Sequence, residues 1–462
     1  MWKLVFFSFL VVMLGLPVVG MERPNIIFLL ADDFGYADMS GPDNSFHETP
    51  HLNRLAREGM SFSHAYASHP TCAPSRLALM TGKYPARHAC VNNGTASMDL
   101  GEVTVAEALK RVGYVTCHAG KWHLGGYGKR PEDQGFDFTI ASNGAGMPGS
   151  FHYPFKDQDP NSILHDEKFN VPDLDDSKPG DHLTDRLTDK VLGFMRDHKD
   201  KPFYLNLCYY AVHTPIEASK VKQRYFENKL TGKSTHRNAS YAGLVSHLDD
   251  SVGRILQAVK DLGIEQNTIV VFFSDNGGLM QATHNGPLRQ GKATPYEGGD
   301  RVPCYVRWPG VTPAGRVCPT PVIGHDFYPT ILRMAGAKGD TVHNKEVDGL
   351  DLTNLLRNPD AGLARDALHW LCYPLPVHYQ NNRLRVPSQV VRKGDWKLIK
   401  FLEAPGKQAQ RYELYNLKSD LGETKDVSRS MPEKTEELQR LMDVWRKQIH
   451  APDYDASMYQ GS

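Results

Sequence analysis

The chain has 462 residues, of which 53 are lysine or arginine and 53 are aspartate or glutamate, so its formal net charge is zero. This length suits one large domain or two domains of moderate size. The charge balance excludes the broad basic surface that is typical of nucleic-acid-binding proteins, so we expect no nucleic acid partner. Any anion that the protein binds must therefore be held by a local site.

The first twenty residues, MWKLVFFSFLVVMLGLPVVG, predict a signal peptide. A single positive charge at Lys3, an apolar run and small residues near Gly20 form the usual secretory pattern. The alternative is a membrane anchor, but a bilayer-spanning helix needs roughly 20 apolar residues. We therefore predict an exported protein (periplasmic, secreted or in a lysosome-like compartment) with no transmembrane segment. In such a protein Asn93-Gly94-Thr95 is also a glycosylation sequon.

After this leader, short apolar runs alternate with helical patterns. NIIFLLADD, GYVTCHAGKWH, FYLNLCYYAVH and TIVVFFSDNGG predict buried strands that begin near residues 25, 113, 203 and 268. Helical patterns cover residues 49–58, 103–111, 183–196 and 241–262. This alternation is typical of an α/β fold in which helices flank a large, mainly parallel sheet.

The pattern changes after about Leu363. SQVVRKGDWKLIKF and RYELYNLKSD predict antiparallel strands, and PEKTEELQRLMDVWRKQI predicts an amphipathic terminal helix. We therefore divide the chain into a signal peptide (1–20), a main domain (21–362) and a smaller C-terminal α+β subdomain with an antiparallel sheet (363–462).

Polar residues with metal-binding or proton-transferring side chains follow the predicted strands. In open α/β sheets, ligands bind at the carboxyl ends of the strands. Asp32, Asp33, Asp275 and Asn276 offer oxygen atoms there, which a hard cation such as Ca²⁺ prefers. Either pair alone could simply cap a turn or helix. Adjacent carboxylates repel one another unless a cation neutralises them, so two such pairs at strand ends favour a metal site.

Positive and proton-donating side chains complete this edge. Lys121 and His123 follow the second predicted strand, and His213 follows the third. Lys292 lies in the glycine-rich segment LRQGKATPYEGGDRVP, which can fold closely around a ligand. A lone histidine is more often structural and a lone lysine is usually solvated, but their positions directly after apolar strands favour a functional site.

Cys72 differs in its surroundings from the other cysteines. The chain has seven, an odd number that leaves one thiol unpaired in an exported protein. Cys117 and Cys208 lie in strand-like runs and are expected to be core thiols. Cys72 instead lies in HPTCAPSRLALMTGKYP, just before a predicted helix that stops at Thr81-Gly82. The alternative is that Cys72 is a buried or disulfide-bonded cysteine.

These motifs together resemble those of the type I sulfatases of the alkaline phosphatase superfamily. CAPSRLALMTGK fits the family's Cys-x-Pro-Ser-Arg run followed by Thr-Gly. ADDFGYADMS, GKWHLG, HTP, SDNGG and GKATPYEGGDRVP follow in the family's order, and GDWKLI with YELYNL resembles its C-terminal subdomain. Lys83 stands where many members have arginine, a mild departure. The resemblance implies an alkaline phosphatase-like fold, with residues 21–362 as the catalytic sulfatase domain.

The resemblance also implies a mechanism, with a role for each site residue. Cys72 would be converted to formylglycine by a formylglycine-generating or sulfatase-maturing enzyme, and its hydrate would attack sulfur and then expel sulfate. One Ca²⁺ would be held by Asp32, Asp33, Asp275, Asn276 and the modified Cys72. Arg76 would hold the hydrate, Lys121 would neutralise charge, and His123 would take a proton. His213 and Lys292 would assist the departure of the leaving oxygen.

Several alternatives stay open. Relatives with the same modified cysteine hydrolyse phosphonate monoesters or phosphodiesters, and a sulfated-glycan-binding protein without catalysis is a further possibility. The substrate would be an aryl sulfate or a sulfated carbohydrate; we expect a carbohydrate rather than a lipid or steroid, because no membrane-facing apolar segment is visible. The stretches NGAGMPGSFHYPF and HWLCYPLPVHYQNNRLR are rich in residues that suit sugar or anion binding, although such loops often only pack.

Overall fold

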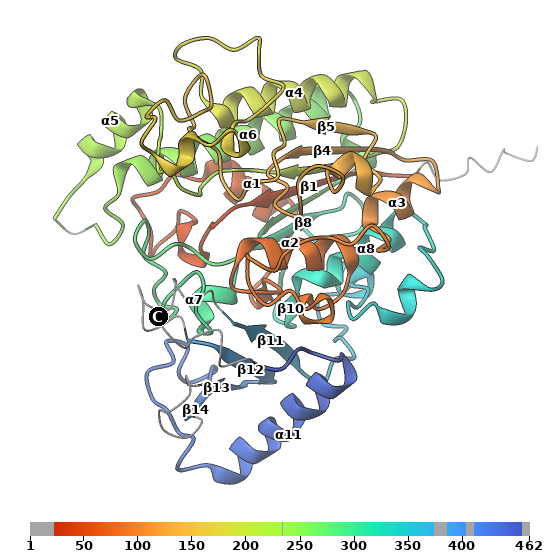
Figure 1. Cartoon of the computed structure of the whole chain (residues 1–462), viewed down its shortest axis with the longest axis vertical. Helices are drawn as coiled ribbons and strands as arrows, with labels where there is room; N and C mark the ends of the chain where they lie inside the picture. Colours follow the sequence, from red (N-terminus) through yellow and green to blue (C-terminus); the bar gives the residue numbers. More distant parts are fainter. Residues whose placement is uncertain (1–22, 233, 374–385, 403–410, 455–462) are drawn as a thin grey trace, which may run out of the picture.

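The computed structural model describes residues 23–232, 234–373, 386–402 and 411–454, so the predicted signal peptide lies outside the described residues. Its centre is an eight-stranded sheet with the order β5-β4-β6-β1-β7-β8-β2-β9 (Figure 1). The parallel strands are β1 (Asn25–Ala31), β4 (Val115–Gly120), β5 (Phe138–Ile140), β6 (Phe203–Cys208) and β7 (Thr268–Ser274). The antiparallel side of the sheet is formed by β8 (Cys304–Arg307) against β7 and by β2 (Met60–Phe62) against β8, with β9 (Val317–Cys318) parallel to β2. The predicted α/β fold is therefore confirmed.

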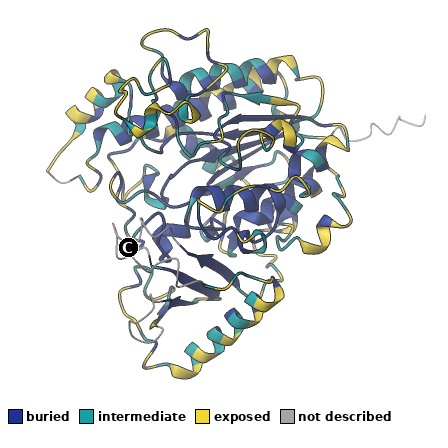
Figure 2. Ribbon diagram, in the orientation of Figure 1, coloured by how far each residue is buried: buried dark blue, intermediate teal, exposed yellow. Residues whose placement is uncertain are grey.

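Helices cover both faces of this sheet, which explains why β1 is buried along its whole length (Figures 1 and 2). Successive side chains of a strand point to opposite faces. Ile26, Phe28 and Leu30 share a core with α2 (Cys72–Thr81), α3 (Val105–Lys110) and α8 (Phe327–Met334). Ile27, Leu29 and Ala31 share the other core with α1 (Pro50–Glu58), α4 (Leu183–Asp197) and α6 (Ala239–Asp261).

The four predicted helices differ from the observed α1, α3, α4 and α6 by no more than two residues at either end. Several elements escaped prediction, the shortest because their patterns are too brief to carry a periodic signal and one ten-residue helix because Phe226 is its one buried residue, so it lacks an apolar stripe. They include α5 (Lys220–Lys229), α7 (Glu297–Asp300), α9 (Thr353–Arg357) and a two-stranded sheet of β3 (Ala65–Tyr66) and β10 (Val322–Ile323). The helices of the described residues include none that is both long and apolar enough to span a bilayer.

The C-terminal region forms the predicted antiparallel sheet, with the order β11-β12-β13-β14. Its strands are β11 (Leu368–Cys372), β12 (Ser388–Lys393), β13 (Trp396–Phe401) and β14 (Arg411–Asn416). Helix α11 (Pro432–Gln448) packs Leu438 and Met442 on one face of this sheet. The other face packs on the main domain, and Lys397 forms a buried ion pair of 3.0 Å with Glu297 of α7. This ion pair anchors the segment between Lys292 and Glu297 against the C-terminal sheet.

Candidate active site

The predicted site residues meet at one edge of the large sheet. Strands β4, β6, β1 and β7 are neighbours in that order, and each ends in a segment that carries predicted site residues. Because the four strands are parallel, their carboxyl ends lie side by side. The predicted residues that hydrogen bonds, ion pairs or sequence adjacency join here are Asp32, Asp33, Cys72, Arg76, Lys121, His123, His213, Asp275, Asn276 and Lys292.

Each acidic residue of the site faces a positive side chain. Lys121 Nζ donates to Asp32 Oδ2 at 2.5 Å, and Arg76 Nε donates to Asp275 Oδ2 at 2.8 Å. Lys292 Nζ lies 2.7 and 2.8 Å from the two carboxylate oxygens of Asp33. These side chains are at least nine-tenths buried, so their charges act in a medium that screens them poorly.

Two oxygen atoms at the centre of the site have no hydrogen-bond partner. Asp32 Oδ1 and Asn276 Oδ1 are both buried and unsatisfied, although Asn276 Nδ2 donates to Asp33 Oδ1 at 2.8 Å. Buried polar atoms without partners are costly, which makes them good indicators of a bound ion. Ligand atoms of Asp32, Cys72 and Asp275 also lie within 4.8 Å of one another. The residues present therefore fit a hard divalent cation.

The pKa shifts of the two adjacent aspartates also support a bound cation. Burial raises the pKa of Asp32 well above its ordinary value, and the neighbouring charge of Asp275 adds to this effect. Burial also acts to raise the pKa of Asp33, but the positive charge of Lys292 and its hydrogen bond, together with the charge of Lys121, outweigh it and hold this pKa below its usual range. A divalent cation beside Asp32 would favour its ionised form, because an opposite charge stabilises a carboxylate.

Cys72 is the first residue of α2, and the whole helix is buried. The helix ends at Gly82, whose φ of +73° is the left-handed conformation that glycine adopts without strain. The Cys72 Sγ atom lies 3.4 Å from His123 Nδ1. The His123 ring itself packs on Gly146, where an added Cβ would lie 2.5 Å from the ring. The loop that follows β5 therefore helps to position His123 over Cys72.

The pKa values of both site histidines are shifted in the direction that favours the neutral ring. Burial and then the charge of Lys121 lower the pKa of His123 well below its ordinary value, and burial and then Lys292 do the same for His213. His213 Nδ1 lies 3.0 Å from the carbonyl oxygen of Thr214, which assigns the ring proton to Nδ1. His213 Nε2 is 3.7 Å from Asp33 Oδ2 and faces the centre of the site.

Asn93 belongs to the site and was missed from the sequence, where it appears only as a glycosylation sequon. Its Nδ2 atom lies 3.5 Å from Cys72 Sγ, and its Oδ1 atom accepts from the backbone of Ala73 at 3.3 Å. No sequence signal distinguishes this amide from a surface asparagine. All seven cysteines are buried, and none forms a disulfide with another described residue, so Cys117 and Cys208 are core thiols of β4 and β6 as predicted.

Comparisons with known proteins agree with this geometry. Residues 24–337 match the family described as Sulfatase, and residues 291–450 match the one described as N-sulphoglucosamine sulphohydrolase, C-terminal. The chain is 32% identical to a sulfatase of Formosa agariphila, over 89% of this chain and 85% of that protein. It is 34% identical to the N-acetylgalactosamine-6-sulfatase of Mus musculus, over 73% of this chain and 67% of that protein.

A solved structure of Ps i-CgsB in complex with k-i-k-neocarrahexaose has the same architecture. It superposes with a TM-score of 0.77 at 28% identity and covers 95% of this chain and 100% of that chain. The resemblance noted in the motifs is thus confirmed over nearly the full length of the fold. The chain belongs to the type I sulfatases, a family of sulfate ester hydrolases.

Proposed function

We propose that this sulfatase hydrolyses a sulfated carbohydrate with a formylglycine made from Cys72 and one bound Ca²⁺. The observation that carries the proposal is the position of Cys72. It begins a buried helix beside four oxygen donors and three cationic side chains, and it matches the Cys-x-Pro-x-Arg run that maturing enzymes modify. The predicted leader supports export of the protein.

Asp32, Asp33, Asp275, Asn276 and the modified Cys72 would hold the ion, because they supply oxygen atoms and two of those atoms lack partners. The cation would supply Lewis-acid stabilisation of the charge on a sulfate oxygen. The formylglycine hydrate would supply one hydroxyl that attacks sulfur and a second that allows sulfate to be expelled.

The chain's own residues then have separate tasks. Arg76 bridges Asp275 and the backbone carbonyl of Lys121, which fixes its guanidinium below the first turn of α2. Lys121 neutralises charge beside Asp32. His123 lies within contact of the nucleophile position and is neutral, so it can accept a proton from the group at residue 72.

His213 and Lys292 lie together on the other side of the site, around Asp33. Lys292 places a positive charge where the ester oxygen leaves. His213 Nε2 would donate a proton to that oxygen; the negative charge of a bound sulfate ester favours the protonated ring and opposes the effect of Lys292 on its pKa.

The names of the relatives support a sugar substrate. One relative is named for the sugar N-acetylgalactosamine, and the solved structure is a complex with a neocarrahexaose, which is an oligosaccharide. Because a steryl-sulfatase of Mus musculus is 31% identical to this chain, a substrate screen should include a sterol sulfate. A screen that measures sulfate release from sulfated sugars, polysaccharides and a sterol sulfate would identify the class.

The reaction itself is tested by comparing nitrophenyl sulfate with a nitrophenyl phosphodiester. We expect kcat/KM for the sulfate to exceed that for the phosphodiester, because the motifs around Lys121 and His213 are those of sulfatases. A faster phosphodiester reaction would assign the protein to the phosphorus-directed relatives instead. Absence of any turnover by protein that carries formylglycine would favour a glycan-binding role.

Replacing His213 by alanine should affect poor leaving groups most. We expect kcat/KM to fall roughly 10²-fold or more on a sugar sulfate, the usual contribution of a positioned acid. The loss should be clearly smaller on nitrophenyl sulfate, because a phenolate needs little protonation to leave. Equal losses on the two substrates would mean that His213 binds the sulfate rather than protonating the leaving oxygen.

A further inference from the structure

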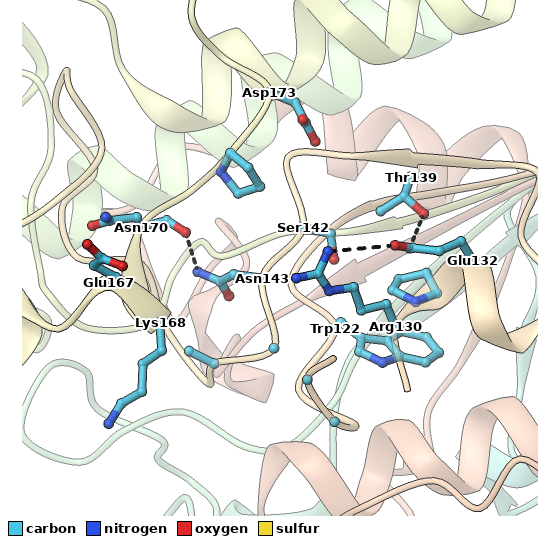
Figure 3. A pocket seen from close by; sticks show the side chains of 16 residues that line it. Trp122, Arg130, Glu132, Thr139, Ser142, Asn143, Glu167, Lys168, Asn170 and Asp173 are labelled. Carbon is cyan, nitrogen blue, oxygen red and sulfur yellow. Dashed lines mark hydrogen bonds and ion pairs between the residues drawn. The ribbon is translucent and has the colours of Figure 1, made fainter. Parts of the chain in front are cut away.

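A cavity of about 790 Å³ opens beside the catalytic edge of the sheet (Figure 3). Three segments line it, and they lie at or beyond the carboxyl ends of β4 and β5. They are the loop from Trp122 to Glu132, the segment from Thr139 to Ala145, and the stretch from Glu167 to Asp173 that begins at a short 3-10 helix. The cavity is therefore built mainly from loops rather than from the strands of the sheet.

Two of these loops also hold His123, which ties the cavity to the catalytic residues. Trp122 lines the cavity and stands between Lys121 and His123 in the chain. Gly144 also lines it and packs against the backbone of Gly125, and Gly146 supports the His123 ring. A sulfate ester held at Cys72 would thus have its organic part next to this cavity.

The charged side chains of the cavity do not form an anion site. Two cations, Arg130 and Lys168, stand against three carboxylates, Glu132, Glu167 and Asp173. Both cations also have acidic partners: Arg130 lies 4.0 Å from Glu132, and Lys168 lies 2.9 Å from Asp166. A second sulfate group placed here would meet more negative than positive charge, which disfavours it.

The polar atoms that remain unsatisfied are acceptors or hydroxyl oxygens. Asn143 and Ser142 line the cavity, and their Oδ1 and Oγ atoms are buried and have no hydrogen-bond partner among the described residues (Figure 3). Asn143 Nδ2 donates to the carbonyl oxygen of Asn170 at 3.2 Å, and this bond orients the amide so that Oδ1 is the free atom. Buried acceptors without partners indicate a ligand that donates hydrogen bonds.

We propose that this cavity binds an uncharged sugar unit joined to the sulfated one, through hydrogen bonds donated by its hydroxyl groups. The proposal rests on the proposed function and narrows the substrate class. The enzyme would prefer oligosaccharides in which sulfated and unsulfated units adjoin over those that carry sulfate on every unit. Tyr127 follows the lining residue Gly126 in the chain and is 96% exposed, so its ring can stack on a sugar ring.

The test compares pairs of oligosaccharides from a galactan and from a glycosaminoglycan, each pair carrying sulfate on one unit or on two adjacent units. Nitrophenyl sulfate, which carries no neighbouring sugar unit, is the reference substrate. We compare the two members of the pair whose singly sulfated compound is the better substrate. In that pair we expect kcat/KM for the singly sulfated compound to exceed kcat/KM for the doubly sulfated compound by about tenfold. Equal or faster hydrolysis of the doubly sulfated compounds would overturn the proposal.

Variants of the cavity provide the second readout. Asn143→Ala should raise KM for the singly sulfated compound about fivefold and leave nitrophenyl sulfate unchanged. Tyr127→Ala, whose side chain is too exposed to affect folding, should act in the same direction. Asn161→Ala, an exposed asparagine of the same region outside the cavity lining, is the matched control and should change neither substrate. Equal losses on both substrates in Asn143→Ala would contradict a subsite role.

Failure of the proposed function gives a different result. If formylglycine-containing protein does not hydrolyse nitrophenyl sulfate, the proposed reaction is wrong. A binding experiment then still tests whether the cavity holds a sugar unit. In that case saturation-transfer NMR with the desulfated galactan disaccharide should show contact that Asn143→Ala abolishes. No contact with the wild-type protein would overturn the subsite.

Discussion

Replacing Cys72 by alanine is expected to abolish sulfate ester hydrolysis, with a loss on the order of 10⁴-fold or more, because the covalent route disappears with the nucleophile. The fold should survive. Among the described residues, the hydrogen-bond contacts of Cys72 Sγ are those of 3.4 and 3.5 Å with His123 and Asn93, and alanine is the most favourable residue in a helix. Steady-state kinetics on nitrophenyl sulfate together with thermal unfolding measure the two effects separately.

The matched control is Cys117→Ala, which also removes a buried free thiol, but from the middle of β4. This variant should keep turnover even where it loses some stability. Peptide mass spectrometry of the active wild-type protein should show that residue 72 has lost sulfur and two hydrogens and gained one oxygen. Fully active protein that carries only unmodified cysteine at this position would refute the formylglycine proposal.

Asp32→Ala should have the second largest effect, on activity and on stability together. Activity should fall on the order of 10³-fold, since the cation loses a ligand and the sulfate oxygen loses its Lewis acid. The variant also leaves Lys121 fully buried without its 2.5 Å partner. Breaking a buried ion pair in this way costs about 3–5 kcal/mol, which denaturant unfolding would register.

Calcium dependence separates this effect from simple destabilisation. The melting temperature of the wild-type protein should rise with added Ca²⁺ and fall with a chelator, and that of Asp32→Ala should respond to neither. Asp176→Ala is the control, because its carboxylate pairs with Arg186 and Lys190 but is 59% exposed. Exposed pairs contribute about 1 kcal/mol or less, so this variant should keep its activity and its response to Ca²⁺. Full activity of the wild-type protein after exhaustive chelation would rule out the cation.

The sequence indicated one lining segment of the cavity beside His123, because Asn143, Gly144 and Ala145 belong to the predicted specificity stretch NGAGMPGSFHYPF. Asn93 and the lining segment of residues 167–173 left no such signal, because neither lies in a periodic apolar segment. Asn93 comes to Cys72 because the loop after α2 folds back over the helix start, and Asn143 faces the cavity because Asn170 orients its amide. Part of the second predicted specificity stretch, residues 374–385, lies outside the described residues.

The residue pattern by itself determined the parallel strands, the helices on both faces and the residue types at the strand ends. Hydrophobic burial gives strands and helices their own periods of apolar residues, which can be recognised locally in the sequence. The residue types at the strand ends show which side chains can supply oxygen ligands or positive charge. The tertiary structure alone decided which charges pair. Arg76 turns to Asp275 and Lys121 to Asp32 because the order β4-β6-β1-β7 places segments far apart in the chain side by side. Strand order is a long-range property that depends on how the whole sheet packs, and no local pattern records it.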